Sequence, residues 1–283
     1  MAGKTTPRIY GMLAAAATAF ALLLTGGAPS TAANPAQEKT INYVNLGDSY
    51  SAGFGSGSII SPFPGCFQGD GPTHVTQIAA LPGVVLTADG ACAGATAQQV
   101  ATMAGALNSQ LAQADLVTLS LGGNNLPFGD TIAACSTLGS PAVCEQMLAA
   151  AWEELDGVQA AVHATLAQID SQTDATILVL GYPRLFTTNN GDQPLVTAST
   201  ARAMNKVNDA LNRSIRSATN GTSAKFVPVL GPFNNHGINA DNSWMYYNTG
   251  NLADPFNVHP NTTGYLNGYF PAVRNHIHLN QLG

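Results

Sequence analysis

Apolar positions follow two different periods along the chain. Short, mostly apolar runs bounded by Gly, Pro or polar residues are typical of buried strands. Runs of this kind lie at 41–46, 84–88, 115–121, 175–180 and 225–229. Longer segments carry apolar residues three or four positions apart, which is the period of a helix with one buried face. Segments of this kind lie at 96–114, 144–169 and 197–218. Strands and helices therefore succeed one another along most of the chain.

This succession predicts the fold class. Strands that alternate with helices form an α/β domain, with a central parallel sheet covered by helices on both faces. We expect residues 34–283 to form a single domain, because they contain no internal repeat and no interdomain linker. Turn-rich stretches at 55–71, 185–194 and 231–251 predict long loops. Loops of this length in a compact domain are usually functional or disordered, so we expect them to shape the entrance of a pocket.

The N-terminal segment is typical of an export signal. Lys4 and Arg8 precede an apolar run at 11–25, and small residues at 28–33 offer a cleavage site. The apolar run is shorter than the ~20 residues that a membrane-spanning helix needs. We therefore expect residues 1–33 to be removed, the mature chain to be secreted, and no stable membrane anchor to remain.

The charge of the mature chain argues against two classes of partner. The whole chain has 10 basic and 16 acidic residues, and the signal segment removes two basic residues and no acidic one, which leaves 8 and 16. Because no basic stripe is present, the sequence predicts no nucleic-acid binding. It also has no basic amphipathic helix of the kind that lies on anionic lipid.

The cysteines are expected to form disulfides. Thiols pair in an oxidising compartment, whereas no CxxC pair or Cys/His cluster supports a zinc site. Four cysteines allow three connectivities. The spacing favours Cys66–Cys92 and Cys135–Cys144, because each pair closes a loop between predicted regular elements.

Four polar motifs occur in order along the chain, each at the end of a predicted strand or in a loop. They are GDSYS at 47–51, CAGAT at 92–96, LGGNN at 121–125 and, near the C-terminus, NVHPN at 257–261. The carboxyl ends of parallel strands meet at one edge of a sheet, where open α/β sheets bind their ligands. The motifs are therefore expected to meet in one site.

The residues of these motifs are the groups that a serine hydrolase needs. A serine hydroxyl becomes a nucleophile when a histidine within hydrogen-bond reach takes its proton. Ser49 is the candidate nucleophile and His259 the candidate base, while His236 in a long loop is a rival base. Donors must also stabilise the oxyanion of the tetrahedral intermediate. The candidates are the backbone N–H groups of Ser49 and Gly94 and the side-chain amide of Asn124.

In these motifs the chain resembles the GDSL, or SGNH, hydrolase family, and especially its secreted actinomycete lipases and esterases. GDSYS, CAGAT, LGGNN and VHPN match the four defining blocks, and the VLGYPR segment at 179–184 also looks like that subgroup. The resemblance runs from about residue 41 to the C-terminus. It implies a three-layer α/β/α, flavodoxin-like fold that hydrolyses esters or thioesters with no metal and no cofactor. It assigns the nucleophile to Ser49, the base to His259 and the oxyanion donors to Gly94 and Asn124.

Two positions depart from the family pattern. Many members carry an aspartate three residues before the catalytic histidine, where this chain has Phe256. Asp254 lies five residues before it, and some secreted members use a backbone carbonyl, here that of Asn257, in place of an acid. Both groups remain candidates for orienting His259. Asn125 stands where aspartate is usual and can tune the adjoining loop without abolishing catalysis.

The sequence therefore predicts a secreted, monomeric serine esterase or lipase that hydrolyses acyl esters or lipids through an acyl-enzyme on Ser49. A phospholipase A or an acyltransferase using the same serine, and a carbohydrate acetylesterase, are alternatives within the same chemistry. A non-catalytic binding module on the same scaffold is an alternative of a different class. Phe63, Phe67, Phe128 and Trp244 are candidates either for an acyl pocket or for the core.

Overall fold

A computed structural model describes residues 40–193, 196–251 and 253–282 of the chain. The expected signal segment, residues 1–33, lies outside the described residues. Within the described ranges, no helix combines the length and the apolar character needed to cross a membrane.

The central sheet of the described residues has five parallel strands in the order β4–β1–β5–β6–β7. The strands are β1 Ile41–Gly47, β4 Val84–Asp89, β5 Leu116–Ser120, β6 Thr176–Leu180 and β7 Lys225–Val227. Counted along the chain within this sheet, the order is 2-1-3-4-5, that of flavodoxin-like folds. Such folds bind ligands where the order reverses, between the first and third strands. Here that point lies between β1 and β5.

The strands form where the sequence predicts them, to within two residues at each end. All five side chains of β5 are buried, and β1 is buried except at Asn42. Parallel strands covered on both faces are apolar along their whole length rather than at alternate positions, which is why short apolar runs identify them.

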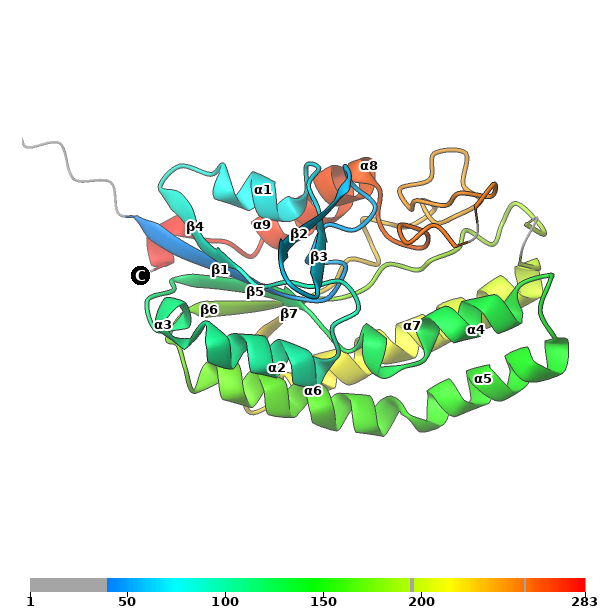
Figure 1. Cartoon of the computed structure of the whole chain (residues 1–283), viewed down its shortest axis with the longest axis horizontal. Helices are drawn as coiled ribbons and strands as arrows, with labels where there is room; N and C mark the ends of the chain where they lie inside the picture. The colour runs from blue at the N-terminus through cyan, green and yellow to red at the C-terminus, as the bar shows by residue number, and fades with distance from the viewer. Residues whose placement is uncertain (1–39, 194–195, 252, 283) are drawn as a thin grey trace, which may run out of the picture. The chain divides into compact units, whose positions relative to one another are not determined.

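Helices cover both faces of the sheet (Figure 1). Neighbouring helices α2, α6 and α7 lie on one face, and α1 and α9 lie on the other. The helices are α1 His74–Ala79, α2 Ala97–Ala106, α3 Asn108–Leu111, α4 Phe128–Cys135, α5 Pro141–Glu153, α6 Leu155–Asp170, α7 Ala198–Ala218, α8 Thr262–Gly264 and α9 Phe270–Arg274. A π-helical turn at Tyr265–Tyr269 joins α8 to α9, and short 3-10 turns lie at Gly123–Asn125 and Leu279–Gln281. The predicted three-layer α/β/α fold is confirmed.

Two predicted helices are each divided in the structure. The segment at 96–114 forms α2 and α3, because Leu107 leaves the helical conformation with φ −99° and ψ 21°. The segment at 144–169 forms α5 and α6. The division between α5 and α6 lets α5 pack against α4 while α6 packs against α2.

The stretch at 55–71, expected to be a long loop, contains a β-hairpin. Its strands are β2 Ile59–Phe63 and β3 Cys66–Gly69, paired antiparallel. The loop prediction was wrong here because Pro, Gly and Ser interrupt the apolar alternation that would have indicated strands. A disulfide joins Cys66 in this hairpin to Cys92, and a second joins Cys135 in α4 to Cys144 in α5. These are the pairs that the spacing predicts.

Candidate active site

Ser49 lies on a sharp turn directly after β1. Gly47 ends the strand with φ +123°, and a Cβ there would lie 2.4 Å from the backbone oxygen of Ser120 in β5. Only glycine combines this φ with such a close approach. The N–H of Asp48 then donates to the Ser120 carbonyl at 2.9 Å, so the turn is fixed to the neighbouring strand. Ser49 is thereby held at the carboxyl edge of the sheet.

The structure brings His259 to Ser49. Nε2 of His259 lies 2.8 Å from Oγ of Ser49, although the two residues are 210 positions apart. Burial lowers the pKa of His259 to about 4, and the nearby backbone carbonyls of Phe256 and Asn257 offset this only in part. The imidazole is therefore neutral at pH 7. A neutral imidazole at this distance can accept the proton of the serine hydroxyl.

Of the two groups expected to orient His259, Asp254 faces elsewhere. Its carboxylate accepts hydrogen bonds from the Tyr246 hydroxyl at 3.0 Å, from the Asn248 amide at 3.1 Å and from the Phe256 backbone N–H at 3.0 Å. These bonds hold the pKa of Asp254 below its usual value. The alternative that placed Asp254 on the imidazole therefore has no support in the geometry.

Nδ1 of His259 lies beside backbone rather than beside an acid. This nitrogen is buried, and within the described ranges no hydrogen bond to it has good geometry. The Phe256 and Asn257 carbonyls are the groups that act on the ring. Asn257 is itself fixed, since its side chain accepts from the Asn248 N–H at 2.6 Å and donates to the Asn251 carbonyl at 2.9 Å. The arrangement favours backbone carbonyls as the orienting groups.

Val258, immediately before the histidine, is in a strained conformation that the sequence does not reveal. Its φ is +64°, in the left-handed region that β-branched residues rarely adopt. The Tyr50 hydroxyl donates to the Val258 carbonyl at 2.7 Å, and the Val258 N–H donates to the Tyr246 carbonyl at 3.0 Å. Such strain persists only where the surrounding contacts impose it. Tyr50 thus links the nucleophile turn to the histidine loop.

The candidate oxyanion donors surround Ser49. Among the described residues, no acceptor is bonded to the backbone N–H of Ser49 or of Gly94. The Asn124 amide donates to the Ala95 carbonyl at 3.1 Å, and its side chain lines the same hollows as Ser49. Gly94 has φ +80°, while a Cβ there would meet nothing within 4 Å. Its positive φ favours glycine at this position, and the open space beside it belongs to the larger hollow.

Asn125, the second departure from the family pattern, supports the start of a helix. Its side-chain oxygen accepts from the N–H of Ala97, the first residue of α2, at 2.9 Å. An amide oxygen and a carboxylate can both satisfy an unpaired N–H at a helix start. Asparagine at this position therefore holds the loop after β5 against α2.

A buried hydrogen-bond network, which the sequence does not reveal, lies beneath Ser49. Asp48 accepts hydrogen bonds from the hydroxyls of Tyr182 and Ser120, the latter at 2.6 Å, and from the Tyr50 N–H at 3.0 Å. Burial raises the pKa of Asp48 even though these bonds lower it. The Tyr182 hydroxyl in turn accepts from the N–H of Gly123 at 3.0 Å, next to Asn124. Tyr182 therefore connects the turn of Ser49 to the loop that carries Asn124, a candidate oxyanion donor.

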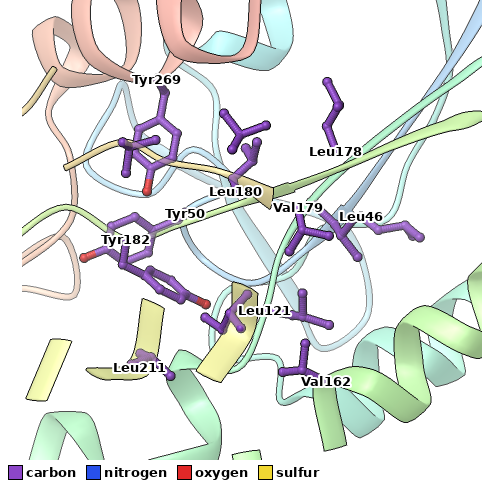
Figure 2. Packing of buried hydrophobic residues seen from close by; sticks show 14 of the residues in the cluster. Leu46, Tyr50, Leu121, Val162, Leu178, Val179, Leu180, Tyr182, Leu211 and Tyr269 are labelled. Carbon is purple, nitrogen blue, oxygen red and sulfur yellow. The ribbon is translucent and has the colours of Figure 1, made fainter. Parts of the chain in front are cut away.

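Tyr182 is positioned by its own surroundings. Its ring meets that of Tyr50 edge to face at a centroid distance of 5.0 Å. Figure 2 shows these two rings and Tyr269 grouped beside the aliphatic side chains of β6. Asn212 of α7 accepts from the Tyr182 N–H at 2.8 Å and donates to its carbonyl at 2.8 Å. The loop after β6 is thus fixed to a helix on one face of the sheet.

Two apolar hollows meet at the serine. The smaller, of about 190 Å³, is bordered by Phe128 and Ile132 of α4. The larger and more open one, of about 490 Å³, is bordered by Ile59 and Phe67 of the hairpin. The residues common to both are Ser49, Asn124 and His259. An ester whose carbonyl lies at Ser49 can therefore extend into both hollows.

Other candidates from the sequence lie outside this site. The His236 ring stacks on Trp244 at a centroid distance of 3.7 Å, and neither residue borders the hollows at Ser49. Phe63 borders a separate hollow. The described residues contain no group of three or more His, Cys, Asp or Glu side chains that could hold a metal ion.

Comparison with known proteins agrees with this geometry. A model of the GDSL-like lipase/acylhydrolase family matches residues 46–266, which include all four motifs. The chain belongs to this family. It is 31% identical over 276 residues to "Lipase 1" of Streptomyces coelicolor, which covers 94% of this chain and 97% of that protein.

Solved structures of the GDSL-like family share the fold. The extracellular lipase of Streptomyces rimosus superposes with a TM-score of 0.76 at 26% identity, over 84% of this chain and all (100%) of that chain. Phospholipase A1 of Streptomyces albidoflavus NA297 gives a TM-score of 0.74 at 26% identity, again over 84% and 100%. The expected family is confirmed, and the protein is an ester hydrolase.

Proposed function

We propose that this GDSL-like hydrolase cleaves carboxylic esters of lipids through an acyl-enzyme on Ser49. The observation that carries the proposal is the 2.8 Å contact between His259 Nε2 and Ser49 Oγ. In this mechanism Ser49 Oγ attacks the acyl carbonyl carbon while its proton passes to Nε2. The backbone N–H groups of Ser49 and Gly94 and the Asn124 amide stabilise the oxyanion.

Collapse of the tetrahedral intermediate completes acylation. The bond to the alcohol oxygen breaks, and the alcohol leaves with the proton held by His259. Water then attacks the acyl-enzyme, giving its proton to Nε2, and the free acid leaves as Ser49 regains its proton. Backbone carbonyls at Phe256 and Asn257 keep Nε2 directed at the serine throughout.

A lipid-sized acyl ester is the substrate class that the surroundings of Ser49 support. Both hollows are mainly apolar, bordered by residues such as Phe128, Ile132 and Phe67, and apolar walls gain free energy by covering hydrocarbon. Relatives named lipase support a neutral lipid ester. The phospholipase A1 neighbour supports a phospholipid as the second candidate.

The proposal extends to the state in which the enzyme works. We propose secretion after removal of residues 1–33, supported by the signal-like N-terminus and by the extracellular relative. Residues 34–283 then act as one hydrolase domain, since Glu38–Gly283 groups into one compact unit. The proposed active form is a monomer that needs neither metal nor cofactor, because the chemistry above uses only groups of this chain.

Trapping the serine tests the proposal directly. A fluorophosphonate should label the protein once, on the peptide that carries Ser49, and Ser49→Ala should abolish both labelling and the hydrolysis of p-nitrophenyl esters from acetate to palmitate. His259→Ala should reduce both by several orders of magnitude, about 10³-fold or more. His236→Ala is the matched control and should retain full activity. A folded Ser49→Ala protein with undiminished turnover would exclude the mechanism.

A further inference from the structure

The β2–β3 hairpin exposes an apolar surface beside the candidate active site. Ile59, Ile60 and Phe67 are 43%, 41% and 48% exposed, and all three lie on this hairpin. Ile59 is paired with Gly69 and Ile60 with Gln68, so Ile59 and Phe67 share one face of the hairpin and Ile60 lies on the other. The hairpin therefore exposes apolar side chains on both of its faces. Single exposed apolar side chains are ordinary on protein surfaces, whereas grouped ones indicate an interaction site. A two-stranded hairpin has little stability of its own, so its position depends on attachments to the rest of the domain.

Those attachments fix the hairpin to the loop at 92–96, the oxyanion loop, which carries the candidate oxyanion donor Gly94. The disulfide joins Cys66 to Cys92, and the Ala93 N–H donates to the Phe67 carbonyl at 2.9 Å. Both bonds lie within two residues of Gly94. The hairpin therefore holds a defined position relative to the site rather than forming a free flap.

The face of the hairpin that carries Ile59 and Phe67 is continuous with the larger hollow. Ile59 and Phe67 border that hollow together with Ser49 and His259, and Pro255 lies on the same lining. An apolar molecule on that face consequently reaches the serine along a mainly apolar lining. This continuity distinguishes the hairpin from exposed apolar residues elsewhere, such as Val85 on β4.

The lack of charge in the hairpin indicates which kind of apolar surface it can bind. Residues 55–69 contain no Asp, Glu, Lys, Arg or His, and the whole chain carries a formal charge of −6. Phosphate-rich anionic surfaces are attracted by Lys and Arg clusters, which this segment lacks. An uncharged apolar patch on an acidic protein matches a surface that is neutral or zwitterionic.

We propose that the β2–β3 hairpin docks on the surface of a neutral or zwitterionic lipid aggregate. Ile59, Ile60 and Phe67 enter the interfacial layer, and the larger hollow then opens directly onto the lipid that carries the ester. The inference rests on the proposed hydrolysis of lipid esters and names aggregated lipid as the partner of that site. A second copy of the chain on this patch would instead cover the entrance to Ser49.

Binding measured without turnover tests the docking. Ser49→Ala protein is sedimented with phosphatidylcholine vesicles, alone and with Ile60→Ser added. Ile60 borders neither hollow at Ser49, so its change leaves the site intact. The affinity for vesicles should fall about three- to eightfold. This is the loss expected when the exposed two-fifths of the isoleucine side chain no longer transfers from water to lipid. Val85→Ser, which alters a side chain that is 49% exposed, is the matched control and should change nothing.

A turnover assay provides the second readout. With Ser49 intact, Ile60→Ser should hydrolyse p-nitrophenyl acetate at the parent rate and an ester held in vesicles several-fold more slowly. Equal losses from Ile60→Ser and Val85→Ser, or no vesicle binding by the parent, would overturn the docking proposal. A dimer that dissociates on Ile60→Ser would assign the patch to a second copy and overturn it as well. If vesicle binding depends on Ile60 but Ser49 proves inert, the proposed function fails and the docking stands.

Discussion

The candidate base owes its proton affinity to the groups around it. Burial lowers the pKa of His259 to about 4 from the 6.5 of a solvated imidazole, and the backbone carbonyls of Phe256 and Asn257 oppose this shift only in part. An acid in contact with Nδ1 would stabilise the imidazolium and raise the pKa. The carboxylate of Asp254 is instead occupied by Tyr246 and Asn248, so the imidazole stays neutral in mildly acidic solution.

This environment predicts an unusual pH profile. Because only neutral His259 can accept the serine proton, kcat/KM on a short water-soluble ester should stay constant down to about pH 5. It should then decline with a midpoint near the pKa of about 4, about tenfold for each further pH unit. Rates between pH 3.5 and 8 measure the profile, and circular dichroism at each pH checks that the protein is folded. A midpoint near 6.5 would show that the imidazole is solvated.

A second prediction at this scale concerns Tyr182. Tyr182→Phe removes the hydroxyl that joins Asp48 to the Gly123 N–H and should lower kcat about tenfold with little change in KM. That loss is smaller than the roughly 10²–10³ of deleting an oxyanion donor itself, because Asn124 is only displaced. Tyr265→Phe is the control, since its buried hydroxyl donates to the Phe54 carbonyl at 2.7 Å. The same kcat loss in both variants would mean that Tyr182 has only a structural role.

At the scale of elements, the two disulfides join different parts of the fold. Cys66–Cys92 ties the hairpin to the oxyanion loop across 26 residues, whereas Cys135–Cys144 ties α4 to α5 across 9. Restricting the unfolded chain over these separations stabilises the fold by roughly 3–4 and 2–3 kcal/mol respectively. The first disulfide lies two residues from Gly94, whereas the second joins two helices that carry none of the candidate catalytic residues.

The predicted consequence is a difference in activity rather than in stability alone. Replacing Cys66 and Cys92 by serine should lower kcat/KM well below that of the Cys135→Ser, Cys144→Ser protein, because only the first pair positions the loop of Gly94. Both variants should unfold at lower urea concentration than the parent. Assays are made at a temperature where each variant is fully folded. Equal kcat/KM values in the two variants would refute a link between the hairpin and the oxyanion loop.

The elements also show what a sequence pattern can and cannot predict. The strands are predictable because parallel strands that are covered on both faces are mostly apolar along their length. The hairpin is not, since Pro62, Pro64 and Gly65 interrupt its alternation. Short helices such as α1 and α4 were also missed, because six to eight residues hold too few turns to display a period.

At the scale of the whole molecule, only some contacts between distant segments could be predicted. Ordered motifs at strand ends indicated that Ser49, Gly94, Asn124 and His259 would meet. Asp48 and Tyr182 are 134 positions apart, and neither carries a local signal that identifies the other as its partner. The position of Asp254 likewise depends on Tyr246 and Asn248, which lie in a segment with no regular period.

The burial of His74 in the core should make the free energy of unfolding depend on pH. This histidine is fully buried against Tyr265 and Tyr269, and neither of its ring nitrogens has a hydrogen-bond partner among the residues that the structure describes. Burial lowers its pKa to about 3 from 6.5. The unfolded chain therefore binds a proton that the folded protein does not, so stability is lost as pH falls below 6.5 toward 3.

His74→Phe should remove that dependence. Between pH 7.5 and 4.5 the free energy of unfolding of the parent should decline by roughly 2–3 kcal/mol more than that of the variant, at about 1.36 kcal/mol per pKa unit. Urea unfolding at the two pH values measures the difference, and contributions from other groups such as Asp89 cancel between the proteins. His236→Phe, a change in a partly exposed histidine, should leave the parent's dependence in place. If the free energy of unfolding declines equally in the parent and in His74→Phe, another group causes the acid sensitivity.

The two hollows that meet at Ser49 also bear on how this enzyme can be altered. Because α4 borders one and the hairpin borders the other, the two parts of a bound ester face walls built from separate segments of the chain. Libraries at Ile132 and at Phe67 can therefore be screened independently and their selections combined, since sites with no shared partners add in free energy. Substitutions in the wall that contacts the alcohol should then change the selectivity for the alcohol while leaving the wall that contacts the acid unaltered.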